Sequence, residues 1–240
     1  MIVPAYNEDQ RILRSLERMR EYLSAQDYSW KVCVVSDGSK DKTEDMVREF
    51  AAQDPRFELM AYQPNRGKGY AVGYGMTHAD AELLLLSDAD LAAPIEEVEK
   101  LFPPLEKGMS IAIGSRPLKE SKLEIRQPWY REFAGRRFND LVQLLAVRGI
   151  KDTQCGFKLF KQEVAQDVFK RCKLNGFSFD FEVLLIARDL GYGIAEIPIR
   201  WAHQEGSKVD FVRDGIRMIR DLIKLRLWGK KKRLEPNGDR

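Results

Sequence analysis

Short, continuous apolar runs recur through the first half of the chain, and each is bounded by polar residues. Runs that leave no solvent-facing side are typical of strands buried on both faces of a parallel sheet. The clearest is the leucine run 83–86, which lies between Glu82 and Ser87. The pattern predicts strands at Met1–Val3, Lys31–Ser36, Phe57–Tyr62, 83–86 and Met109–Ser115.

Apolar positions at helical spacing, or helix-start signals, separate these runs. The face of the first helix carries Ile12, Leu13, Leu16, Met19 and Leu23. Asn7 with Gln10 has the spacing of an N-cap and capping box, and Asp41 with Glu44 marks the start of the second helix. A third, glycine-studded helix runs to Ala79. This alternation implies right-handed crossovers and a parallel, Rossmann-like sheet flanked by helices, an α/β fold.

The pattern becomes less regular after Arg116. We expect a charged loop over Pro117–Pro128 and a short strand within Asp152–Phe160, followed later by a strand at Ile194–Trp201. Helices are expected at Trp129–Arg148, Lys161–Lys173, Phe179–Leu190 and about Val209–Trp228. We interpret residues 1–208 as one domain and residues 209–240 as a basic amphipathic helix with a polar tail.

That last helix has two distinct rows of side chains. The apolar row is Val212, Ile216, Ile219, Ile223 and Leu227. The basic row, one residue out of phase, is Arg213, Arg217, Arg220 and Lys224. With Lys230–Arg233 beyond it, the segment fits an anionic membrane surface. The alternatives are a domain helix with a solvated basic face and a nucleic-acid tail, but the chain lacks a recognised nucleic-acid module and we expect no nucleic acid.

Composition narrows the cellular setting. The 240 residues carry a net charge of +3, and the three cysteines have no metal-ligand spacing. An odd number of cysteines argues against a disulfide framework, so we expect reduced thiols and a cytoplasmic protein. No apolar run approaches the roughly 18 residues that span a bilayer, so we expect the protein to be soluble or peripheral on the cytosolic face of a membrane.

Polar groups follow four of the predicted strands. They occur at Pro4–Glu8, at Asp37, at Asn65–Gly69 and at Asp88–Asp90. Ligands collect outside the carboxyl ends of strands in an open α/β sheet, so these segments are expected to converge. Asp88 and Asp90 offer hard oxygen ligands for Mg²⁺ or Mn²⁺. Taken singly, each segment could equally be an ordinary turn.

Two common nucleotide motifs are absent. The glycines after the third strand read G-x-G-x-x-x-G, which is one residue too long for a dinucleotide fingerprint, and no Walker A sequence is present. Lys68 nevertheless adds positive charge at a helix start that already favours an anion. Tyr6 could cover the flat face of a base, and Asp37 could accept an N–H from it.

The four segments resemble those of family 2 glycosyltransferases, which have the GT-A fold. The residues are Pro4-Ala-Tyr-Asn-Glu8, Ser36-Asp-Gly-Ser-Lys-Asp-Lys-Thr43, Asn65-Arg-Gly-Lys-Gly69 and Ser87-Asp-Ala-Asp-Leu91. Asp152-Thr-Gln-Cys-Gly-Phe-Lys-Leu-Phe160 and Glu205-Gly-Ser-Lys208 are similar to polyprenyl-phosphate sugar synthases, above all the dolichyl-phosphate β-glucosyltransferases.

The resemblance implies a role for each matching residue. A metal-dependent enzyme of this kind would hold the nucleoside with Pro4, Tyr6, Glu8 and Asp37, and the metal with Asp88 and Asp90 around Ala89. Lys68 and Lys208 would touch the diphosphate, with Arg200 and Lys208 in a loop that closes over the donor. Arg116 and Arg131 would meet the acceptor phosphate, for which guanidinium is well shaped.

The resulting hypothesis is an inverting transferase that moves glucose from UDP-glucose to a polyprenyl phosphate. An ionised phosphate can attack without a general base, whereas a hydroxyl acceptor would need one. Asp180 is the candidate base, with a helix N-cap as its structural alternative. The rivals are a hydroxyl acceptor, a GDP-mannose donor, and a nucleotide-binding recruitment module without catalysis. His203, near the proposed closing loop, is interpreted as structural.

Overall fold

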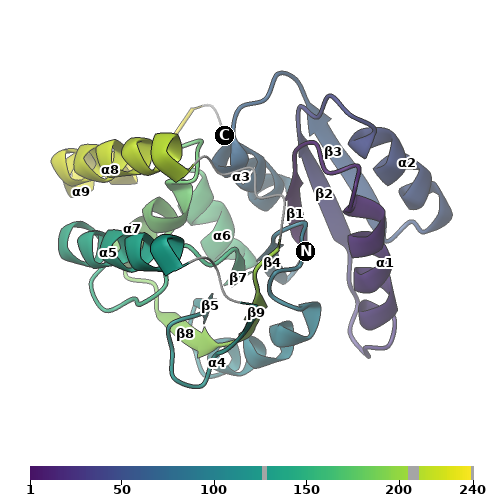
Figure 1. Cartoon of the computed structure of the whole chain (residues 1–240), viewed down its shortest axis with the longest axis horizontal. Helices are drawn as coiled ribbons and strands as arrows, with labels where there is room; N and C mark the ends of the chain where they lie inside the picture. Colours follow the sequence, from purple (N-terminus) through teal and green to yellow (C-terminus); the bar gives the residue numbers. More distant parts are fainter. Residues whose placement is uncertain (126–128, 205–210, 239–240) are drawn as a thin grey trace.

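A twisted seven-stranded sheet forms the centre of the molecule (Figure 1). The computed structural model describes residues 1–125, 129–204 and 211–238. The strand order is β3-β2-β1-β4-β7-β5-β8. The strands are β1 (Ile2–Ala5), β2 (Val32–Asp37), β3 (Phe57–Tyr62), β4 (Leu83–Ser87), β5 (Ile111–Ser115), β7 (Phe157–Lys161) and β8 (Ile194–Pro198).

The first half of the chain builds the parallel part of this sheet. β1 pairs in parallel with β2 and β4, and β2 pairs in parallel with β3. The connecting helices are α1 (Ile12–Leu23), α2 (Thr43–Gln53) and α3 (Lys68–His78). The strand order reverses direction at β1, so the carboxyl ends of β1, β2 and β4 meet at one edge, where such sheets bind ligands.

The second half inserts one antiparallel strand. β7 lies between β4 and β5 and is antiparallel to both, while β5 pairs in parallel with β8. The sheet is therefore mostly parallel, as predicted, but not wholly so. The insertion places Phe157 opposite Ser87, directly beside the end of the leucine strand.

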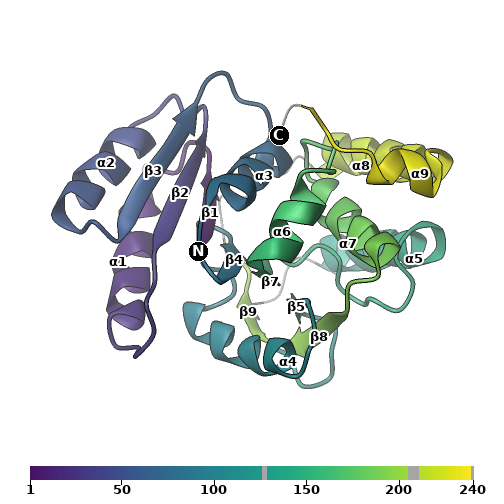
Figure 2. The ribbon, with the colours of Figure 1, turned by 180° about the vertical axis from the view of Figure 1, so that it is seen from behind.

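Both faces of the sheet are covered by helices (Figures 1 and 2). In β4, Leu84 and Leu86 pack on one face and Leu85 on the other, because successive side chains alternate across a strand. One face packs against α3 together with α5 (Trp129–Leu145), α6 (Gln162–Phe169), α7 (Phe179–Leu190) and α8 (Phe211–Leu227). The other packs against α1 and α2 together with the 3₁₀ helix η1 (Ile95–Lys100) and α4 (Phe102–Glu106).

Several local expectations were wrong. Asn7 does not cap a helix: α1 begins after Arg11, and the Asn7 side chain accepts a hydrogen bond from the amide of Lys40. The expected loop Pro117–Pro128 contains strand β6 (Lys122–Ile125). This strand pairs with β9 (Arg200–Ala202), which the expected strand Ile194–Trp201 had merged with β8. Residues 126–128 lie outside the described residues.

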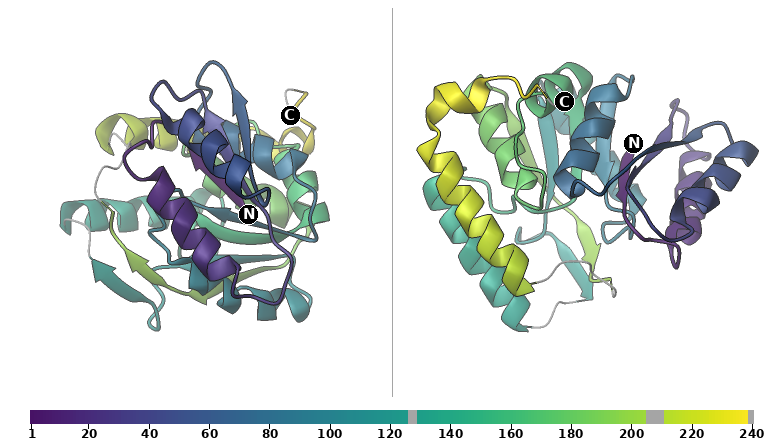
Figure 3. Two further views of the ribbon diagram at one scale, coloured as in Figure 1. Left: turned by 90° about the vertical axis from the view of Figure 1, so that its right-hand side faces the viewer. Right: turned by 90° about the horizontal axis from the view of Figure 1, so that it is seen from above.

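The segment after α8 makes contacts with the domain as far as Asn237. Helix α9 (Gly229–Leu234) follows α8, and residues of α9 and of the segment after it contact the domain. Arg233 pairs with Asp189 at 2.6 Å, and Asn237 donates to the carbonyl of Cys172 at 2.8 Å. Figure 3 shows α8 and α9 along one flank of the molecule, beside α5. Across the described residues, no helix is both long and apolar enough to cross a bilayer.

Candidate active site

A cleft of about 760 Å³ opens at the carboxyl edge of the parallel strands. One wall comes from the ends of β1, β2 and β4 and from the segment before α3. The opposite wall comes from residues 176–178 and from α8. Residues that line it include Pro4, Tyr6, Glu8, Arg11, Asp37, Asn65, Lys68, Asp88, Ala89, Asp90, Ser178, Arg213, Arg217, Arg220 and Asp221. The four strand-end segments singled out in the sequence therefore do converge.

Asp37 organises the loop beside it. Its carboxylate accepts hydrogen bonds from the Tyr62 hydroxyl at 2.8 Å, the Asn65 side chain at 2.9 Å and the amides of Arg66 and Gly67 at 2.7 and 2.9 Å. Burial raises the pKa of Asp37 despite these donors. Both carboxylate oxygens are already hydrogen-bonded, so Asp37 fixes the loop that borders the cleft, whether or not it also contacts a nucleotide base.

Gly67 explains why this loop needs glycine. Its φ of +101° lies in a region of backbone conformation that residues other than glycine rarely adopt. A Cβ at this position would also sit 2.4 Å from the carbonyl oxygen of Asn175. The same carbonyl accepts the amide of Gly69 at 2.8 Å. The glycines therefore bring the start of α3 against the segment that precedes α7. This close approach joins the two walls of the cleft.

Asp88, Asp90 and Lys68 form the charged floor of the cleft. Lys68 Nζ lies 2.6 Å from Asp88 Oδ1. Burial alone would lower the pKa of Lys68, but the Asp88 carboxylate raises it overall. Burial and the charge of Asp88 raise the pKa of Asp90, whose Oδ1 also accepts the amide of Ala92 at 3.1 Å. Because the charge of Asp88 disfavours ionisation of Asp90, a cation that binds both carboxylates would stabilise their charged forms.

The donor set fits a divalent cation of the Mg²⁺ or Mn²⁺ kind. Both side chains offer hard carboxylate oxygens and line the cleft, and the amide of Leu91 donates to the carbonyl of Asp88 at 3.2 Å, which closes the turn that carries them. Among the described residues, no third His, Cys, Asp or Glu joins them in a metal-ligating group. Mg²⁺ is commonly held by one or two carboxylates plus substrate phosphates, which this pair leaves room for.

Arg11 is a cleft residue that the sequence reasoning missed. Its guanidinium pairs with Glu8, with Nη2 3.0 Å from Oε1. The hydrogen bonds that Arg11 donates to the Glu8 carboxylate raise the pKa of Arg11, and the more distant charges of Asp90 and Asp88 add to the effect. Glu8 is held in turn through its amide, which donates to Thr43 at 2.7 Å. The only signal in the sequence was the i, i+3 spacing of Glu8 and Arg11.

Arg116 and Arg200, two of the predicted site residues, lie outside the cleft. Arg116 does not line the cleft: its Nε and Nη2 donate to Asp152 at 2.7 and 2.9 Å. Arg200 donates its Nε and its amide to the buried Glu97, at 2.6 and 3.1 Å. Of the remaining predictions, the Arg131 side chain and Lys208 lie outside the described part of the chain.

Asp180 is neither in the cleft nor an N-cap. It lies inside the first turn of α7, after Ser178 at the cap position, and is 3% exposed. Its carboxylate forms an ion pair with Lys158, which is 1% exposed and also donates to the carbonyl of Cys155 at 2.6 Å. Burial raises the pKa of Asp180, although Lys158 opposes the shift.

The second wall of the cleft was also unforeseen. Arg213, Arg217 and Arg220 of α8 line it, although the sequence pattern had suggested that this basic row faces a membrane. Their i, i+4, i+7 spacing showed that they share a face. Which way the face points depends on packing. The Ser178 hydroxyl donates to Asp221 at 2.8 Å and ties α8 to the start of α7.

Comparisons with known proteins agree with this geometry. Residues 1–169 match the family model for glycosyl transferase family 2. The dolichyl-phosphate beta-glucosyltransferase ALG5A of Trichomonas vaginalis is 36% identical over 238 residues, covering 95% of this chain and 72% of that protein. The dolichyl-phosphate beta-glucosyltransferase of Homo sapiens is 34% identical over 240 residues, covering 95% and 74%.

Solved structures share the fold at much lower identity. Glucosyl-3-phosphoglycerate synthase from Mycobacterium tuberculosis, in complex with phosphoglyceric acid, superposes with a TM-score of 0.71 at 16% identity, covering 99% of this chain and 80% of that one. The same enzyme in complex with Mn²⁺ and UDP-glucose gives a TM-score of 0.67 at 16% identity, covering 94% and 77%.

Proposed function

Because the chain belongs to glycosyl transferase family 2 and has its GT-A fold, we propose that it transfers glucose from UDP-glucose to a dolichyl or other polyprenyl phosphate, with inversion at the sugar. The relatives named dolichyl-phosphate beta-glucosyltransferase support the acceptor and the sugar. The related fold in complex with UDP-glucose and Mn²⁺ supports the donor and a divalent metal.

The observation that carries the proposal is that Asp88, Asp90 and Lys68 lie together in the cleft, at the carboxyl end of β4. Asp88 and Asp90 would hold the cation, and Lys68 would place a further positive charge beside the donor diphosphate. When bound, the metal stabilises the negative charge that builds on the departing diphosphate. Pro4 and Tyr6, on the β1 side of the same cleft, are proposed to hold the nucleoside.

The state of Asp180 favours a phosphate acceptor over a hydroxyl acceptor. A hydroxyl would need a carboxylate within hydrogen-bond reach. Asp180, the carboxylate considered for that role, is buried and paired with Lys158. A phosphate monoester is already largely ionised at neutral pH, so positioning and charge stabilisation suffice.

The protein is further proposed to work at the cytosolic face of a membrane, as a peripheral enzyme. A polyprenyl phosphate acceptor is anchored in the bilayer by its tail. The support from this chain is α8, whose apolar row is exposed, and the lysines 230–232 that follow it. An exposed apolar row beside basic side chains suits an anionic membrane surface.

A donor and acceptor screen tests the proposal. The purified protein is incubated with Mn²⁺ or Mg²⁺, a short polyprenyl phosphate and a panel of UDP- and GDP-sugars. We expect UDP-glucose to give a glucosyl lipid phosphate with β configuration, and GDP-mannose to give little product. Preferential use of GDP-mannose, or transfer only to hydroxyl acceptors, would overturn it.

A further inference from the structure

Helix α8 presents two different chemistries on neighbouring faces. Arg213, Arg217 and Arg220 line the cleft. Next to them, Ile216 is 65% exposed, Ile219 42%, Ile223 48% and Leu227 79%. Residues one position apart on a helix are offset by about 100°, so the apolar row lies immediately beside the arginine row.

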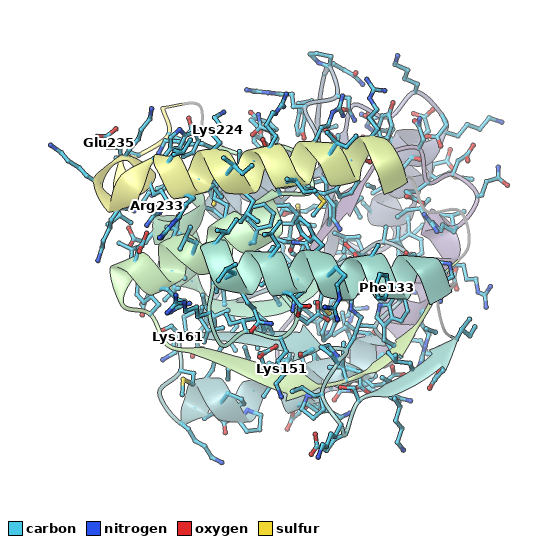
Figure 4. All side chains as sticks on the ribbon, turned by 60° about the vertical axis from the view of Figure 1, so that its left-hand side comes forward. Phe133, Lys151, Lys161, Lys224, Arg233 and Glu235 are labelled. Atoms are coloured by element: carbon cyan, nitrogen blue, oxygen red, sulfur yellow. The ribbon has the colours of Figure 1, made fainter. Side chains whose placement is uncertain are left out.

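The rotation of α8 is set by packing. Leu222 and Leu225 are fully buried in the same core as α7, and Asp221 accepts the hydroxyl of Ser178. These contacts hold a third face of α8, the one with Leu222 and Leu225, against the core. Because that face is fixed, the arginine row faces the cleft and the isoleucine row faces solvent. Figure 4 shows α8 alongside α5, which contributes Phe133, 58% exposed, to the surface.

The arginines provide positive charge away from the donor residues. Arg217 Nη1 lies 3.6 Å from Oδ1 of Asp214, a largely buried carboxylate that also lines the cleft. Within the described part of the chain, no carboxylate lies within ion-pair distance of Arg220, which is exposed. The floor of the cleft carries Lys68, Asp88 and Asp90, so the three arginines form a second group of basic side chains, on the α8 side.

We propose that α8 binds the acceptor: Arg217 and Arg220, with Arg213, receive the phosphate of the polyprenyl phosphate, and the Ile216, Ile219, Ile223 and Leu227 row lies along its hydrocarbon tail. This rests on the proposed function. Guanidinium groups are shaped for phosphate oxygens, and the tail needs an apolar surface that begins where the phosphate is held. An amphiphile with one charged end matches the two adjacent rows. Arg116, first considered for the phosphate, is already held by Asp152.

The test compares Arg217→Gln/Arg220→Gln with the matched control Arg226→Gln, an exposed arginine of the same helix that does not line the cleft. Transfer of glucose from UDP-glucose is measured against polyprenyl phosphate concentration, and UDP affinity by calorimetry with Mn²⁺ present. We expect the double variant to raise the KM for the acceptor about tenfold or more, since charged hydrogen bonds to phosphate are lost. UDP affinity should be unchanged, and Arg226→Gln should match the unmodified protein.

A second arm separates the tail from the phosphate. Ile216→Ser, at a largely exposed position, should raise the KM for a long polyprenyl phosphate and leave that for a two-isoprene phosphate unchanged. An unchanged acceptor KM in the arginine variant, or a loss of UDP affinity in its place, would overturn the inference while leaving the proposed function intact. If the unmodified protein glucosylates no polyprenyl phosphate, the proposed function itself fails.

Discussion

Gly156 lies directly against the carboxylate of Asp88. A Cβ at position 156 would sit 2.1 Å from Oδ2 and 2.7 Å from Oδ1 of Asp88, closer than real atoms approach. Gly156 comes just before β7, the antiparallel strand inserted beside β4. One proposed metal ligand is thus positioned by the backbone of a segment far away in the sequence.

Gly156→Ala is therefore expected to disable the enzyme while preserving its fold. The methyl group would push the Asp88 carboxylate aside, and a misplacement of about 1 Å at a reacting centre can cost about a hundredfold in rate. Turnover of UDP-glucose and the melting temperature are the two measurements. Gly135→Ala in α5 is the control, because a Cβ there meets no atom within 4 Å. A fully active Gly156→Ala variant would mean that Asp88 need not occupy this position.

Asp90→Ala should abolish metal-dependent turnover with little change in stability. The variant removes one of the two proposed ligands and leaves the buried leucines of β4 in place. Glucose transfer is measured across a manganese titration, and folding by circular dichroism. EDTA should inactivate the unmodified protein in the same way. Loss of folded structure in the variant would assign Asp90 a structural role.

The buried pair of Lys158 and Asp180 allows a stringent test of the acceptor class. Asp180→Asn alone should cost about 3 to 5 kcal/mol of unfolding free energy, because it leaves Lys158 buried without a counter-charge. Asp180→Asn/Lys158→Met removes both charges and should recover much of that loss in urea titrations.

The same double variant is then assayed for transfer. With a phosphate acceptor it should retain activity, since Asp180 does not line the cleft. Activity that disappears from a stably folded double variant would instead support a base role for Asp180, and with it the hydroxyl-acceptor rival.

The pair of Arg116 and Asp152 predicts a particular dependence of stability on pH. Burial alone would raise the pKa of Asp152, but Arg116 lowers it overall. A carboxyl with a lowered pKa in the folded state contributes stability above its unfolded pKa of about 3.9, and that contribution is lost as the pH falls toward the folded value. Unfolding free energies from pH 6 to pH 3 should thus fall less steeply in Asp152→Asn, although that variant is less stable at pH 6. Asp27→Asn, at an exposed position, is the control and should follow the unmodified protein.

Lys230 and Lys231 should contribute to binding of anionic vesicles. Both are exposed on α9, and basic residues near such a surface are worth about 1 kcal/mol each at low salt. Co-sedimentation of Lys230→Gln/Lys231→Gln with phosphatidylserine vesicles should show weaker binding, and the difference should shrink in high salt. Deleting the residues after Trp228 is a poorer experiment, because Arg233 and Asn237 hold the end of the chain to the domain. If the lysine variant binds the vesicles as strongly as the unmodified protein, α9 does not contribute to membrane binding.

The sequence by itself determined the parallel half of the sheet and the segments at its carboxyl edge. The leucine run of β4 ends at Ser87, and the strand ends that were expected to converge do line one cleft. These features can be predicted from the sequence because they depend on local patterns. A strand buried on both faces has no alternation of apolar and polar residues, and the topology of a parallel sheet brings the strand ends together whatever their side chains.

Only the tertiary structure decided how the second half completes the site. Arg116 meets Asp152 across 36 residues and Lys158 meets Asp180 across 22, so neither pairing has a local pattern. The same holds for β7, whose antiparallel entry brings Gly156 to Asp88, and for α8, whose buried leucines turn its arginines toward the cleft. Hydrophobic periodicity tells which residues share a face. The direction in which that face points depends on long-range packing, because each helix or strand packs its apolar side against residues from other parts of the chain.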